Sequence, residues 1–243
     1  MSGRPTSPQV YALAFETSGR DGSIALGLGG RILDVRHFSG PRKHAVEFLP
    51  SIAGLCRAHR VAPCDIAHVF VSQGPGSFTG LRIGTTAARM LALANRAELV
   101  GVPTLNVIAE NAVDVPEPPE RAAVLLDAKR GRVYAAAFVR IDGTYQPETE
   151  PIEADPRIFL AERHPDCAVL GEGVLYHREA VAAAGRPVLP EALYPPRAET
   201  VYRLGHRLAV AGKFTPPRTL VPTYVRPPEA EEKWEEKIRS GGR

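Results

Sequence analysis

A glycine-rich segment between an apolar run and an amphipathic run is the sequence feature that most constrains the fold. The segment Gly74–Gly84 follows the apolar stretch His68–Ser72 and leads into a helical pattern over Ile83–Arg96. A strand, a glycine turn and a helix in this order are typical of α/β proteins, where helices pack on a sheet. Free backbone N–H groups at such a turn attract anions. The sequence therefore predicts an α/β fold and leaves two readings of the segment, an anion site or a structural turn.

The residues before this segment predict a three-stranded meander followed by a helix. Asp-Gly and Gly-Gly pairs separate the first three apolar runs and are strong hairpin signals. Apolar residues then recur at helical spacing over His44–Arg60, where Pro50 predicts a kink or a later start. The predicted strands are Val10–Glu16, Ser23–Leu28, Arg31–Phe38, His68–Ser72 and Leu99–Val102.

A second group of strands and helices follows, so we expect two lobes. Asp155-Pro156 combines an N-cap residue with proline at the first helical position. The other predicted elements are a helix over Thr104–Val113, strands Ala122–Asp127, Arg132–Ile141 and Cys167–Gly171, and helices over 176–184 and 200–212. The predicted division is a tail over 1–9, an N-terminal lobe over 10–103, a C-terminal lobe over 104–226 and an acidic tail over 227–243. That last tail, with Trp234, is either solvated or a docking segment.

Composition sets limits on location and partners. No apolar run approaches the roughly 20 residues that span a bilayer, and the three cysteines form no Cys-x-x-Cys pair, so we expect a cytoplasmic protein with no membrane association. The net charge of +3 is only mildly basic. Basic residues are scattered, with Lys129, Arg130 and Arg132 the densest group, which argues against a stand-alone RNA-binding module.

The glycine-rich segment lacks the residues of the common phosphate loops but begins a ridge of small residues. It contains no lysine that could reach a terminal phosphate. Gly80, Gly84, Ala88 and Ala92 recur every four positions, so they form one ridge that allows close helix packing. The spacing alone fits packing inside one lobe and docking of a partner helix equally well.

The same segment carries a family resemblance. Gly-Pro-Gly-Ser-Phe-Thr-Gly-Leu-Arg-Ile-Gly closely resembles the corresponding segment of the TsaB (YeaZ) family. Other matching pieces follow in the family's order, and the resemblance covers roughly residues 10–226. These pieces are Ala14–Ser18, His44 ahead of Phe48-Leu49-Pro50, Leu126–Tyr134 and Pro222–Arg226.

The resemblance implies a fold, a function and partners. The fold is of the actin/Hsp70-like ATPase (ASKHA) type, two lobes each with a ribonuclease-H-like mixed sheet flanked by helices. The function is that of a non-catalytic scaffold and dimerisation subunit in the bacterial formation of N6-threonylcarbamoyladenosine at position 37 of ANN-decoding tRNAs. The implied partners are a TsaD-like catalytic subunit and a TsaE-like ATPase, with tRNA met through the complex and a homodimer when the chain is alone. The chain itself requires no cofactor, whereas the assembled complex binds ATP or ADP.

The resemblance also assigns residues to a docking surface and to a vestigial cleft. Docking uses the first-lobe helices at about 44–60 and 80–96, which favours the ridge as an interface. The expected interface residues are Phe48, Leu49, Ile52, Gly80, Leu81, Gly84, Ala88, Leu91 and Ala92. The expected nucleotide or anion cleft consists of Glu16, Thr17, Ser18, Gly74, Gly76, Ser77, Thr79 and Asp127.

Several residues argue against independent catalysis or a metal site. The catalytic paralogue holds a metal with two histidines four residues apart, whereas here Phe48 follows His44 at that spacing. A lone His44 is then a capping or surface residue. Glu16 and Asp127 could instead be paired carboxylates that hold Mg²⁺ or perform acid–base chemistry, or each could stabilise its own turn. The alternative function is a nucleotide-dependent phosphotransferase or hydrolase of the actin-like class.

Overall fold

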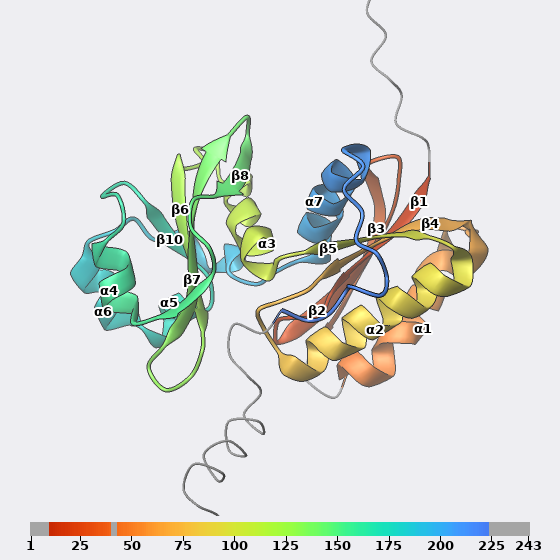
Figure 1. Ribbon diagram of the computed structural model, residues 1–243, viewed down its shortest axis with the longest axis horizontal. Coiled ribbons are helices and arrows are strands. Elements are labelled where there is room, and N and C mark those ends of the chain that lie inside the picture. Colours follow the sequence, from red (N-terminus) through yellow and green to blue (C-terminus); the bar gives the residue numbers. More distant parts are fainter. Residues whose placement is uncertain (1–9, 40–42, 224–243) are drawn as a thin grey trace, which may run out of the picture.

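The computed structural model describes residues 10–39 and 43–223 and places them in two lobes, each built on one sheet (Figure 1). The predicted acidic tail and Trp234 lie outside the described residues. In the first lobe, β1 (Tyr11–Glu16), β2 (Asp21–Leu28) and β3 (Arg31–Ser39) form the predicted antiparallel meander. The strands β4 (Ile66–Ser72) and β5 (Glu98–Val102) continue the sheet in parallel, in the order β3-β2-β1-β4-β5.

Helices cover both faces of the first sheet because its strands alternate apolar residues between the faces. Leu13 and Phe15 pack with α1 (Lys43–Ala58) and α2 (Phe78–Asn95) on one face. Ala12 and Ala14 pack with α7 (Ala198–Val210) on the other face. Pro50 lies inside α1, and α2 begins at Phe78, earlier than the predicted Ile83.

The second lobe repeats the arrangement of a meander and a parallel strand. Strands β6 (Arg121–Asp127), β7 (Val133–Ile141), β8 (Thr144–Pro147) and β10 (Ala168–Leu170) lie in the order β10-β6-β7-β8, and β9 (Ile152–Ala154) pairs with β7. The α3 helix (Thr104–Glu110) continues into a 3-10 turn over Asn111–Asp114. The remaining helices are α4 (Pro156–Ala161), α5 (Gly173–Tyr176) and α6 (Arg178–Ala184). The strands β8 and β9 have no counterpart in the sequence-based prediction.

The segment from α7 to Thr223 does not stay in the second lobe. Helix α7 packs on β1, β2, β4 and β5, and Tyr202 is fully buried against the first sheet. After α7, the chain follows β5, where the Thr215 N–H donates to the Leu99 carbonyl at 2.7 Å. Farther on, the Thr223 N–H donates to the Gln73 carbonyl at 2.6 Å. We therefore propose a discontinuous first lobe that adds 198–223 to the predicted 10–103, leaving 104–197 as the second lobe.

Candidate functional site

The glycine-rich segment folds over the turn that follows β1. The Ser77 N–H donates to the Ser18 carbonyl at 2.7 Å. A Cβ on Gly76 would lie 2.5 Å from that same carbonyl oxygen, so only glycine fits. Gly74 has a φ of +110°; its carbonyl accepts from the Thr104 N–H at 2.8 Å, and its N–H donates to the Thr104 hydroxyl at 3.2 Å. Thr79 is exposed. The structure thus brings the first-lobe residues of the expected cleft together. These residues bond to and pack against one another.

Glu16 ends β1 in a fully buried position beside this turn. One carboxylate oxygen, Oε1, accepts hydrogen bonds from the Ser18 N–H and hydroxyl, both at 2.5 Å. Among the described residues, Oε2 has no hydrogen-bond partner, and neither has the buried hydroxyl of Ser72 at the end of the adjacent strand β4. Burial raises the pKa of Glu16, and the nearby hydroxyls of Ser18 and Ser72 oppose that shift.

Asp127 lies at the end of β6 in the second lobe, beside Lys129 and His177. Its Oδ2 is 2.9 Å from Lys129 Nζ, and its Oδ1 accepts from the Lys129 N–H at 3.2 Å. His177 Nε2 is 3.7 Å from Oδ1. The bond from Asp127 raises the pKa of Lys129, which keeps this cation charged. Each carboxylate thus accepts hydrogen bonds within its own turn, which is compatible with the reading in which each stabilises that turn.

The small residues of the α2 ridge contact this chain's own first lobe, whereas the sequence-based prediction favoured a partner interface. A Cβ on Gly80 would overlap the Thr17 carbonyl oxygen, and one on Gly84 would overlap the Thr17 hydroxyl. Ala88 is fully buried and Ala92 is 3% exposed in the core between α2 and the sheet. The ridge therefore faces its own lobe. Larger side chains at Gly80 and Gly84 would prevent α2 from approaching the turn after β1 this closely.

Seven of the nine predicted interface residues leave little surface for a partner to contact. They are buried within this chain: Phe48, Ile52, Gly80, Leu81, Gly84, Ala88 and Ala92. Of the other two, Leu49 is 64% exposed and Leu91 is partly buried. Three further apolar side chains, missed by the sequence reasoning, are at least as exposed on these two helices: Val46, Met90 and Leu93. Their i, i+3 spacing on each helix was the available signal.

The described residues contain no group of three or more His, Cys, Asp or Glu side chains placed to hold a metal ion. His44 lies in α1, and its side chain is outside the described part of the structure. His37, on β3, has Nε2 at 3.9 Å from Glu199 Oε1. Among the helices of the described ranges, none is long and apolar enough to cross a membrane.

Two mixed sheets of matching topology, helices on their faces and a turn after each first strand define the actin/Hsp70-like ATPase class. The family model for TsaD, tRNA N6-adenosine threonylcarbamoyltransferase, matches residues 39–160. The chain belongs to this family and, within it, to the TsaB (YeaZ) group.

Full-length relatives support the assignment to that group. The chain is 29% identical to the tRNA threonylcarbamoyladenosine biosynthesis protein TsaB of Bacillus subtilis, over 79% of this chain and 84% of that one. It is 27% identical to the protein of the same name from Escherichia coli, over 88% and 94%. A Pseudomonas aeruginosa crystal structure described as an uncharacterized protein similar to peptidase YeaZ has 26% identity and a TM-score of 0.79, over 89% and 100%.

Proposed function

We propose that the chain is the TsaB-type scaffold subunit in the formation of N6-threonylcarbamoyladenosine at position 37 of ANN-decoding tRNAs. The observation that carries this proposal is similarity along most of the chain to proteins named for this pathway, over 79% and 88% of its residues. The catalytic step then belongs to a TsaD-like subunit, with a TsaE-like ATPase in the same assembly. ATP or ADP and tRNA are bound by that assembly.

The geometry of the cleft supports a non-catalytic role. A nucleotide-dependent phosphotransferase would need the Glu16 carboxylate accessible to a metal or a phosphate. Here Glu16 is fully buried and bonded to Ser18, Ser18 is in turn bonded to the glycine-rich segment, and Lys129 pairs with Asp127. Neither carboxylate is therefore both exposed and unpaired, as a nucleotide–metal complex would require.

The exposed faces of α1 and α2 are the surface that we propose for the TsaD-like partner. The two helices lie side by side on one face of the first sheet (Figure 1). Val46, Leu49, Met90 and Leu93 are between 64% and 71% exposed there. Apolar side chains gathered on one surface favour association because their burial removes apolar area from water. The same face would serve a homodimer when the partner is absent.

A charge placed on this face tests the proposal. We expect Leu49→Glu combined with Leu93→Glu to weaken binding to a purified TsaD-like subunit by about 2 kcal/mol or more, roughly thirtyfold in Kd, because two charges would be desolvated. Titration calorimetry measures the change. The matched control is Ile158→Glu on α4, since Ile158 is 63% exposed on the other lobe. Equal loss with the control, or full binding by the double variant, would contradict the assignment.

A further inference from the structure

The chain crosses between the two lobes twice. Each crossing leads into a helix, and these two helices face each other. The first runs from β5 into α3, whose Leu105, Ile108 and Ala109 lie in the second-lobe core. The second runs from Tyr194 to α7, which is packed on the first sheet. Helices α3 and α7 are in contact, so side chains between them connect one lobe to the other.

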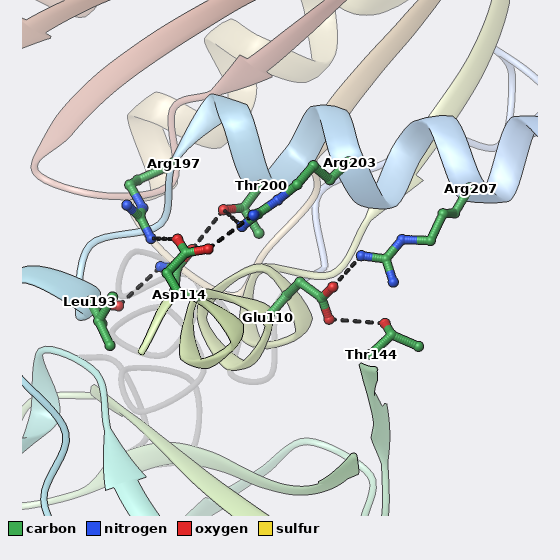
Figure 2. A network of polar contacts seen from close by, with 9 residues as sticks. Glu110, Asp114, Thr144, Leu193, Arg197, Thr200, Arg203 and Arg207 are labelled. Carbon is green, nitrogen blue, oxygen red and sulfur yellow. Dashed lines mark hydrogen bonds and ion pairs between the residues drawn. The ribbon is translucent and has the colours of Figure 1, made fainter. Parts of the chain in front are cut away.

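Acidic side chains of α3 and of the 3-10 turn that follows it pair with arginines of α7 and of the residue before it (Figure 2). Glu110 pairs with Arg207, and Asp114 pairs with Arg203 at 3.0 Å and with Arg197 at 2.8 Å. Position 110 meets the later part of α7 and position 114 meets the earlier part, so the pairing is antiparallel. We call this set of five charged residues the α3–α7 latch.

Glu110 is the buried centre of the latch, with 1% of its side chain exposed. Its Oε1 accepts from Arg207 of α7, whereas Oε2 accepts from the Thr144 hydroxyl at 2.9 Å and the Tyr145 N–H at 3.0 Å. One carboxylate therefore joins the first-lobe helix to β8 of the second lobe (Figure 2). Rotation of the lobes that separated Arg207 from Glu110 would leave a buried charge unpaired, which is strongly unfavourable.

Asn111 fixes the second crossing next to the latch. Its Nδ2 donates to the carbonyls of Leu193 at 3.0 Å and Pro195 at 2.9 Å, and its Oδ1 accepts from the Thr200 hydroxyl at 2.7 Å. The amide is fully buried with all of these bonds made. Pro195 and Pro196 follow in sequence, and their rings fix φ. The segment that would have to bend if the lobes moved is held on both sides.

A further contact joins the lobes at the turn after β1. Arg20 Nε lies 3.2 Å from Glu172 Oε1, and Gly19 lies against Pro196. Arg20 is 76% exposed, so solvent weakens this ion pair. Glu172 also accepts from the Tyr176 hydroxyl at 3.2 Å. This exposed ion pair is therefore a weaker link between the lobes than the contacts of buried Glu110.

We propose that the α3–α7 latch holds the two lobes at one fixed angle, so that the chain acts as a rigid body. This inference rests on the five paired charges, on the contacts that hold the two chain crossings, and on the buried carboxylate shared between the lobes. The consequence for an assembly is that surfaces on both lobes are presented together in constant geometry.

Distances between spin labels on the two lobes test the inference. Cys64 is exposed in the first lobe, whereas Cys56 and Cys167 are buried, so one added cysteine gives a labelled pair. Ala183→Cys supplies it on the exposed side of α6 in the second lobe. Pulsed electron paramagnetic resonance on the full chain should give one narrow distance distribution that millimolar Mg-ATP leaves unchanged. A broad or bimodal distribution, or a shift with Mg-ATP, would overturn the inference.

Latch variants in the same labelled chain show whether the latch sets the angle. Glu110→Gln and Arg207→Gln should each broaden the distribution, whereas Arg157→Gln should not, because Arg157 pairs with Glu179 inside the second lobe. If the substitution at buried Glu110 prevents folding, Arg197→Gln with Arg203→Gln removes the partly exposed end of the latch instead. Broadening in the folded latch variants supports the proposal. Distributions as narrow as the wild type in these variants would show that other contacts fix the lobes.

Discussion

At the scale of single residues, Glu16 places a carboxyl group in the interior of the first lobe, at the end of β1. Its carboxyl group is fully buried, with one oxygen bonded to Ser18 and the other without a partner in the described residues. Burial raises its pKa, so the folded state holds this proton more tightly than the unfolded state does. The stability that Glu16 contributes is complete below its unfolded pKa of about 4.5 and is lost as pH rises through the folded pKa.

Glu16→Gln should therefore stabilise the protein near neutral pH. The amide keeps an oxygen for Ser18 and removes the buried charge, which we expect to raise the free energy of unfolding by about 1 kcal/mol or more. The gain should shrink as pH falls toward 4.5. Urea unfolding between pH 5 and pH 8 measures it. A gain that is constant across this range, or a loss at pH 8, would contradict the account of Glu16.

At the scale of elements, two glycines without side chains allow α2 its close approach to the turn after β1. Gly80 and Gly84 leave room for Thr17, so the helix lies directly under the turn after β1. Ser77 accepts the Gly80 N–H at 3.3 Å and caps the helix start. The regular spacing of small residues was visible in the sequence, but spacing gives only the face of a helix and not what the face meets.

Gly80→Ala and Gly54→Ala compare a helical glycine that makes room for a neighbouring segment with one that has no neighbour. The added methyl at position 80 would overlap backbone, and we expect a loss of about 1–3 kcal/mol of stability. Gly54, in α1, has nothing within 4 Å of the same position, so alanine there should stabilise by about 0.5–1 kcal/mol through helix propensity. Thermal melts compare the two. Similar effects at both positions would mean that Thr17 does not set the position of α2.

At the scale of the whole molecule, each lobe engages one carboxylate of the expected cleft in contacts of its own. Glu16 is covered in the first lobe, and Asp127 is paired with Lys129 in the second. The α3–α7 latch joins the lobes on their shared side. A binding role in a larger assembly is consistent with both features.

The isolated chain should therefore show a flat melting temperature across millimolar Mg-ATP. A ligand at one hundred times its Kd would add about 2.7 kcal/mol of stability. Scanning fluorimetry with and without Mg-ATP measures this difference, with the TsaD-like partner alone and the two-chain complex as comparisons. A rise in the melting temperature of the isolated chain on addition of Mg-ATP would favour the alternative of an actin-like phosphotransferase or hydrolase.

The sequence alone determined the local features of this protein. Hairpin glycines, helical periodicity and the Asp155-Pro156 start predicted most elements, because each depends on neighbouring residues. The motif at Gly74–Gly84 predicted the family. The weak strands β8 and β9 went unpredicted because pairing with β7 stabilises them.

Only the tertiary structure decided which faces meet. It placed the ridge of α2 against Thr17, returned α7 to the first sheet, and joined Glu110 to Arg207 across 97 positions. Glu110 and Asp114, and likewise Arg203 and Arg207, stand four residues apart, which was a signal that complementary helix faces existed. Their pairing could not be read from the sequence, because contacts between distant segments depend on the packing of whole sheets and helices.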